Sequence, residues 1–157
     1  MSVVDISSRS KVEIERVLSN FAHRPFILDD IQCISMEGFL QALKFEDVPT
    51  QRYVVGKWGY DAFRHGQTGN AWKLVQILWW NGDPYCRHSE DYAELLTRAY
   101  DAQFEQSLEL RDALRSTVGS VLRHSMGKND PRDSVLTEAE YIHQLERLRW
   151  RALDERR

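Results

Sequence analysis

The stretch Ser35-Met36-Glu37-Gly38-Phe39-Leu40-Gln41-Ala42-Leu43-Lys44-Phe45 predicts a short amphipathic helix. Ser35 is a favoured N-cap residue, because its hydroxyl oxygen can accept a hydrogen bond from a free amide of the first turn. The apolar residues of the stretch recur at the spacing of one helix face; they are Met36, Phe39, Leu40 and Leu43. We therefore expect residues 35–45 to form a helix that packs this face against the core.

The same helix carries three polar side chains beside its apolar face. Glu37, Gln41 and Lys44 stand at positions i, i+4 and i+7, so they share one side of the helix. One interpretation is a solvated face with a Glu–Gln contact worth a few tenths of a kcal/mol. The other is a site that presents an acid, an amide and an amine together to a ligand.

The segments before this helix predict little regular structure. Residues 1–11 are polar and rich in serine, so we expect a flexible lead-in, and residues 12–14 alternate as a short strand would. Residues 26–28 and, apart from Gln32, residues 31–34 are apolar and flank Asp29-Asp30, which predicts a small β-hairpin.

The segments after it predict mostly helices. The expected elements are a helix over 52–65 that ends at Gly66, a helix from Asn70 through Trp79, a turn over 81–84, helices over 89–106 and 109–116, an extended piece over 118–124, a loop over 125–135, and a final helix that begins at the capping box Thr137-Glu138-Ala139-Glu140. The sequence therefore predicts a single α+β domain over residues 12–157, mainly α-helical, with a small β-hairpin or short sheet.

Composition excludes several classes of protein. The chain has 157 residues, 42% of them hydrophobic and 29% charged, which is typical of one globular domain. Its formal charge of −3 argues against a bulk electrostatic nucleic-acid binder. No apolar run approaches the roughly 20 residues of a membrane span, and no export signal opens the chain. We expect a cytoplasmic protein that uses no metal or cofactor.

Three separate segments, in this order and at this spacing, resemble the opening signature of the NADAR/YbiA-like family. They are Leu18-Ser19-Asn20-Phe21, Pro25-Phe26 and residues 35–45. A looser likeness continues through residues 62–66, Trp72, residues 99–115 and residues 145–149, so the resemblance covers most of the chain from about residue 14.

This resemblance implies a YbiA-like fold and an N-glycosidase activity. The substrate would be an ADP-ribosyl or phosphoribosyl conjugate, for example ADP-ribosylated guanine or a ribosylaminopyrimidine of riboflavin synthesis. The partner would be a small nucleotide or ADP-ribose-type ligand, with ADP-ribosylated nucleic acid as a further candidate. Carried over residue by residue, Asn20 and Phe21 would bind the ribose or base, and Glu37 and Lys44 would lie at the reacting centre.

The chemistry of these residue types suits such a reaction. Cleavage of an N-glycosidic bond passes through an oxocarbenium-like state, which a carboxylate stabilises while it or a neighbour activates water. A lysine among apolar side chains can lose its proton near neutral pH, so Lys44 is also a candidate nucleophile on an opened sugar.

The sequence departs from the family pattern at residues 127–136, Gly-Lys-Asn-Asp-Pro-Arg-Asp-Ser-Val-Leu, where the tryptophan of the family loop is absent. Within this loop Asn129 and Asp130 are candidates for a polar pair, with Asp130 as a second catalytic carboxylate, although Asn-Asp-Pro is also a good turn sequence. Further candidates for contact with the substrate are Gln41, Arg64, Gly66, Trp72 and His124. Core packing, helix-end charge and a structural histidine are the alternatives for these.

Two other functions stay open. The altered loop favours a module that binds ADP-ribose or another nucleotide without turning it over. A helical structural protein would simply leave the Glu37–Lys44 face in water.

Overall fold

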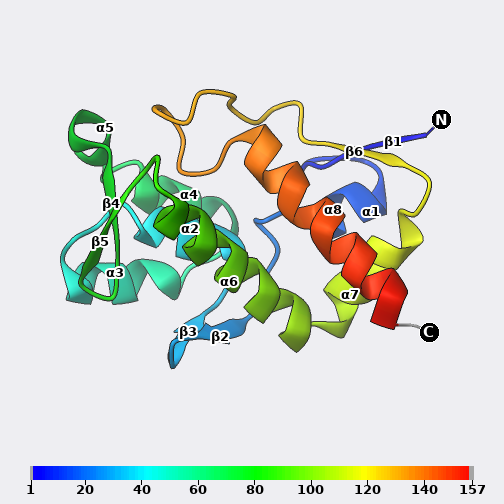
Figure 1. Cartoon of the computed structure of the whole chain (residues 1–157), viewed down its shortest axis with the longest axis horizontal. Coiled ribbons are helices and arrows are strands. Elements are labelled where there is room, and N and C mark those ends of the chain that lie inside the picture. The colour runs from blue at the N-terminus through cyan, green and yellow to red at the C-terminus, as the bar shows by residue number, and fades with distance from the viewer. Residues whose placement is uncertain (1, 156–157) are drawn as a thin grey trace.

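The computed structural model describes residues 2–155 and confirms an α+β fold in which helices predominate (Figure 1). The helices are α1 (Glu13–Val17), α2 (Met36–Ala42), α3 (Val48–Val55), α4 (Gly59–Gly66), α5 (Trp72–Val75), α6 (Glu90–Gln106), α7 (Leu108–Ser116) and α8 (Glu138–Glu155). The strands are β1 (Val3–Asp5), β2 (Phe26–Leu28), β3 (Ile31–Cys33), β4 (Ile77–Trp80), β5 (Asp83–Cys86) and β6 (Val121–Arg123).

The strands form three separate two-stranded sheets. β2 and β3 pair antiparallel, as the predicted hairpin requires, and β4 and β5 do the same. β1 and β6 pair in parallel, although more than a hundred residues separate them in sequence, with Val3 opposite Val121. Because no sheet within residues 2–155 is larger than two strands, the helices supply most of the core.

Helix α2 lies at the centre of the molecule and is buried along its whole length. It packs against α3, α4, α6 and β3. The predicted cap is confirmed: the Ser35 Oγ accepts a hydrogen bond of 2.8 Å from the Gly38 amide. Gly38 also permits a close approach, because a Cβ there would lie 2.4 Å from the backbone oxygen of Lys57.

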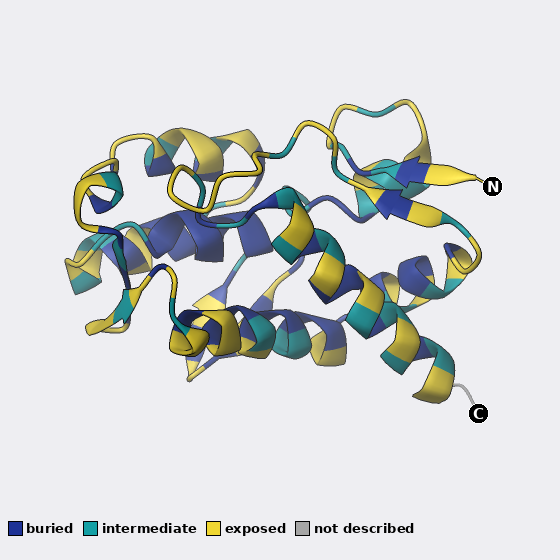
Figure 2. Cartoon of the chain, turned by 45° about the horizontal axis from the view of Figure 1, so that its top comes forward, coloured by how far each residue is buried: buried dark blue, intermediate teal, exposed yellow. Residues whose placement is uncertain are grey.

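The two long helices α6 and α8 run side by side, and α6 packs against α2 (Figure 1). Figure 2 shows that each turns a buried stripe inward and leaves its other face exposed. The capping box of α8 is confirmed, since Thr137 and Glu140 each accept a hydrogen bond from the other's amide. Within residues 2–155 no helix combines the length and the hydrophobicity that crossing a bilayer requires.

The predicted flexible lead-in over residues 1–11 is wrong for residues 3–6. β1 lies beside β6, and Ile6 is completely buried (0% exposed), with its amide donating a hydrogen bond of 2.8 Å to the Arg123 oxygen. The pairing partner is distant in sequence, so local composition gave no sign of it. Residues 12–14, expected as a strand, instead lead into α1.

Two predicted helices are divided by backbone turns. The expected helix over 52–65 is interrupted at Gly56–Trp58, which separates α3 from α4, and Gly59 has a positive φ of 61°. The expected helix over 70–79 is only α5, because Gln76 adopts the left-handed conformation and ends it. Residues 77–86 are a β-hairpin whose two-residue turn is Asn81-Gly82, a dipeptide typical of such turns.

The buried end of the β1 segment predicts a stability effect. Ile6→Ala should lower the free energy of unfolding by about 2–5 kcal/mol, since it removes a fully buried side chain. The control is Val3→Ala, where the side chain is 56% exposed and the expected change is within about 0.5 kcal/mol. Urea denaturation measures both, and equally small effects would show that residues 3–6 unfold apart from the domain.

Candidate functional site

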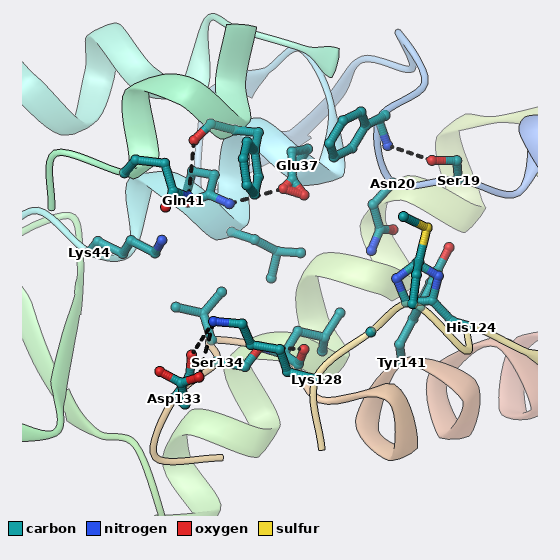
Figure 3. Close-up of a pocket in the computed structure, with 18 of the residues that line it drawn as sticks. Ser19, Asn20, Glu37, Gln41, Lys44, His124, Lys128, Asp133, Ser134 and Tyr141 are labelled. Atoms are coloured by element: carbon teal, nitrogen blue, oxygen red, sulfur yellow. Dashed lines mark hydrogen bonds and ion pairs between the residues drawn. The ribbon is translucent and has the colours of Figure 1, made fainter. Parts of the chain in front are cut away.

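A cavity of about 550 Å³ lies beside α2, within the usual size range of small-molecule sites. Its walls come from residues 8–9 and 19–21, from α2, α4 and α5, from the segment 124–136 and from the start of α8. Figure 3 shows that the polar end of α2 faces the loop of residues 124–136 across this space. Segments from both ends of the chain thus meet at one site.

The predicted polar face of α2 lines the cavity. The Gln41 Nε2 donates a hydrogen bond of 3.1 Å to the Glu37 Oε2, and the Lys44 Nζ donates one of 3.4 Å to the Gly66 oxygen. Glu37 is only 8% exposed. A solvated face is therefore the wrong interpretation, and the structure brings the acid, the amide and the amine together at one cavity.

Burial shifts the pKa values of Glu37 and Lys44 in opposite directions. It raises the pKa of Glu37, against the hydrogen bond from Gln41 and the nearby charge of Lys44. It lowers the pKa of Lys44 to about 8; the charge of Glu37 opposes this, and those of Lys73 and Lys128 add to it. Both groups are thus shifted toward their neutral forms, as is common at functional sites.

Asn20 and Phe21 form another wall of the cavity. The Tyr100 hydroxyl donates a hydrogen bond of 3.1 Å to the Asn20 Oδ1, which leaves the amide nitrogen to face the cavity (Figure 3). Phe21 packs near Phe63, and Phe63 near Tyr60, with ring centroids 6.2 and 6.0 Å apart. These three rings provide an aromatic wall that can contact a base.

His124 also lines the cavity, and a hydrogen bond fixes its tautomer. Its Nδ1 lies 2.8 Å from the Ile6 oxygen. A carbonyl oxygen only accepts hydrogen bonds, so Nδ1 carries the hydrogen and Nε2 of the neutral ring keeps a lone pair. The ring packs edge-on against Tyr141. Residue Ile6 of the N-terminal segment therefore orients this side chain.

Four other predicted site residues do not belong to the cavity lining. Asp130 and Asn129 are exposed and outside the cavity lining, and the Asp130 Oδ1 accepts a hydrogen bond from the Arg132 amide within the turn. The prediction of Asp130 as a second carboxylate of the site is corrected accordingly. The Arg64 side chain is 66% exposed and is paired with Asp61. Gly66 acts through packing, because a Cβ there would lie 1.8 Å from the Gln41 Oε1.

Two lysines and one aspartate of the cavity were missed from the sequence. The Asp133 carboxylate lies 2.8 Å from the Lys73 Nζ and 3.1 Å from the Lys128 Nζ, and all three residues line the cavity. Local sequence gave no sign of which acid of the 127–136 loop turns inward. The scarcity of lysine, five residues in the whole chain, is the one sequence signal that could have drawn attention to Lys73 and Lys128.

Trp72 lines the cavity as predicted, but its indole Nε1 is buried with no hydrogen-bond partner in the described chain, and the same holds for the Gln41 Oε1. Such unpaired buried atoms are uncommon in native proteins. Among residues 2–155 there is no cluster of three or more histidine, cysteine or acidic side chains that could hold a metal ion.

The raised pKa of Glu37 predicts a pH-dependent stability difference. Because the folded-state pKa lies above the unfolded-state value, the stability that Glu37 contributes is fully present below about pH 4.5 and is lost as the pH rises through the folded pKa. Glu37→Gln, which stays neutral, should therefore gain stability relative to wild type as the pH rises above about 4.5. Chemical denaturation across this range measures the difference, and a constant difference would contradict the buried carboxyl.

The solved structure of the Escherichia coli protein YbiA, determined by NMR, has a similar fold. It matches with a TM-score of 0.63 at 19% identity, over 99% of this chain and 87% of YbiA. The predicted YbiA-like fold is therefore confirmed.

Sequence comparison gives the family. The uncharacterised 17.1 kDa protein of the Gp30–rIII intergenic region of Enterobacteria phage T4 is 41% identical over 133 residues, which are 84% of this chain and 88% of the phage protein. The family model of bacteriophage protein GP30.3 matches residues 14–150. Since that match includes every element from α2 to α7 and nearly all of α8, this chain belongs to the GP30.3 family of bacteriophage proteins.

Proposed function

We propose that this protein is an N-glycoside hydrolase that acts on an ADP-ribosyl or phosphoribosyl conjugate, such as ADP-ribosylated guanine or a ribosylaminopyrimidine. The observation that carries this proposal is the meeting of the buried Glu37 carboxyl with Lys44 at one cavity. The resemblance to the NADAR/YbiA-like family supports the choice of reaction.

The rest of the cavity suits such a conjugate. The aromatic wall of Phe21, Tyr60 and Phe63 offers faces on which a base can stack. The amide of Asn20 offers a donor to a sugar oxygen. Four basic side chains in the lining suit the phosphate groups; they are Arg9, Lys44, Lys73 and Lys128.

Glu37 is proposed to act first as an acid. In its protonated form it donates a proton to the leaving nitrogen while the bond from that nitrogen to C1′ breaks. The resulting carboxylate then faces the oxocarbenium ion and stabilises it, and this interaction is strong because the side chain is buried. Water adds to C1′ and returns a proton to Glu37, which restores the starting state.

Lys44 has two possible parts in this reaction. As a cation it holds the conjugate and favours the carboxylate formed on Glu37. With its pKa lowered to about 8, a fraction of the side chain is neutral near pH 7 and can attack C1′ of the ring-opened sugar instead. The bond from C1′ to the leaving nitrogen then breaks, the base leaves as its amine, and water hydrolyses the imine on Lys44 to release the sugar and free the lysine. Treatment with borohydride during turnover separates the two routes, since only an imine on Lys44 is reduced to a stable adduct that mass spectrometry detects.

We place the reaction in the cytoplasm, where nucleotide conjugates are made. Cys33 and Cys86 are free thiols, one buried and one exposed, which suits a reducing compartment.

Removal of the proposed acid should abolish turnover without unfolding the protein. Glu37→Gln keeps the shape of the side chain, so we expect a loss of kcat of about 10²-fold or more while the thermal melt stays cooperative. The control is Glu94→Gln, an exposed carboxylate on α6, which should keep full activity. Release of free base from each conjugate is followed by chromatography.

Full turnover in Glu37→Gln would refute the role of this residue. Tight binding of ADP-ribose in calorimetry, with no product from either conjugate on prolonged incubation with wild type, would instead identify a binding module. Absence of both binding and product would reject the proposal as a whole.

A further inference from the structure

Positive charge is concentrated at the cavity. Three of the five lysines of the chain line it, namely Lys44, Lys73 and Lys128, and they come from three different segments. They lie close enough together that Lys73 and Lys128 help to lower the pKa of Lys44. Like charges held together cost free energy in an empty site, and an anion between them removes that cost.

The Asp133 carboxylate already lies between two of these lysines, Lys73 and Lys128. The Asp133 Oδ1 is 2.8 Å from the Lys73 Nζ, and its Oδ2 is 3.1 Å from the Lys128 Nζ. Each carboxylate oxygen therefore has its own ammonium group, as two oxygens of a phosphate would. Figure 3 shows Asp133 and Lys128 across the cavity from Glu37.

We propose that Lys73 and Lys128 form a phosphate-binding subsite, and that Asp133 is an internal occupant which a phosphate group of the ligand displaces. The proposal rests on the proposed function to the extent that the phosphate is that of the conjugate. The subsite lies opposite Glu37, so a ligand that spans the cavity has its phosphate at the lysines and its sugar at the acid.

The backbone around Asp133 is held in place, so displacement needs only rotation of the side chain. The Gln76 Nε2 donates a hydrogen bond of 2.9 Å to the oxygen of Arg132, the residue before Asp133. The Arg87 Nε donates one of 2.8 Å to the oxygen of Ser134, the residue after it. Arg87 is itself buried and paired with Glu140. The loop is thus anchored on both sides of the occupant.

The Asp133 carboxylate makes the proposed subsite selective for anions of higher charge. A singly charged anion gains little by replacing Asp133, which already balances part of the charge of both lysines. A phosphate dianion has more charge and more acceptor oxygens, so it can compete with the carboxylate. The subsite should therefore bind phosphate esters and diphosphates in preference to chloride or carboxylates.

Binding measurements test this on the full chain with opposite expectations for two variants. Calorimetry with inorganic pyrophosphate and with ADP-ribose should give about tenfold weaker binding for Lys128→Met, because a charge-assisted contact is lost. Asp133→Asn should bind both ligands at least about threefold more tightly, since the competitor loses its charge. Adenosine, which has no phosphate, should bind equally to all variants.

Two exposed residues provide matched controls for the change in charge. Lys11→Met and Glu94→Gln alter the net charge in the same way at positions outside the cavity lining, and should leave both affinities unchanged. Thermal melts show that each variant is folded. Weaker binding in Asp133→Asn, or unchanged binding in Lys128→Met, would overturn the proposal.

These measurements distinguish a failure of the proposed subsite from a failure of the proposed hydrolase activity. Pyrophosphate binding that follows these expectations, without any hydrolysis of a conjugate, would support the subsite and refute the hydrolase. Hydrolysis that is unaffected by Lys128→Met and Asp133→Asn, with unchanged affinities, would refute the subsite and leave the hydrolase standing.

Discussion

The burial of α2 is the constraint on which the rest of the structure depends. All seven residues of this helix are buried, so its polar side has little contact with bulk water and depends on partners within the protein. The Glu37 carboxyl receives one hydrogen bond from Gln41, and Lys44 reaches a backbone oxygen. Burying ionisable groups with so few partners is costly, and the cost appears as the opposite pKa shifts of the two groups. The cavity is the space that this polar side faces.

Glycine makes the central position of α2 possible. The helix approaches the α3–α4 junction at Gly38, where the Lys57 oxygen occupies the place of a side chain. On the polar side, the Gln41 amide fills the space that a Cβ on Gly66 would take. These two contacts set how closely α3 and α4 surround the helix. The remaining walls, from the N-terminal segment and the 124–136 loop, then cover a side that is already organised.

Local patterns predicted the elements that local interactions form. Ser35 and Thr137 cap helices as expected, and the periodicity of residues 89–106 gave α6 within one residue. The sequence did not reveal the features that depend on long-range contacts. The β1 segment is ordered by its pairing with β6, far along the chain, and the Asp133 side chain is held at the cavity by Lys73 of α5. The site was predictable on α2 and the turn that follows it, which together set the spacing of Glu37 and Lys44. It was not predictable in a loop whose side-chain directions depend on distant anchors such as Arg87.

The net charge of the chain and the charge of its cavity have opposite consequences. A formal charge of −3 describes the average surface and argues against binding to long polyanions. The cavity lining has four basic side chains and two acidic ones, and burial disfavours the charged form of one of those acids, Glu37. Positive charge is therefore local to the cavity; the Lys73 and Lys128 side chains remain partly exposed, so added salt still weakens their attraction for an anion. The proposed anionic ligand would thus meet a local positive charge that the net charge of the chain does not reveal.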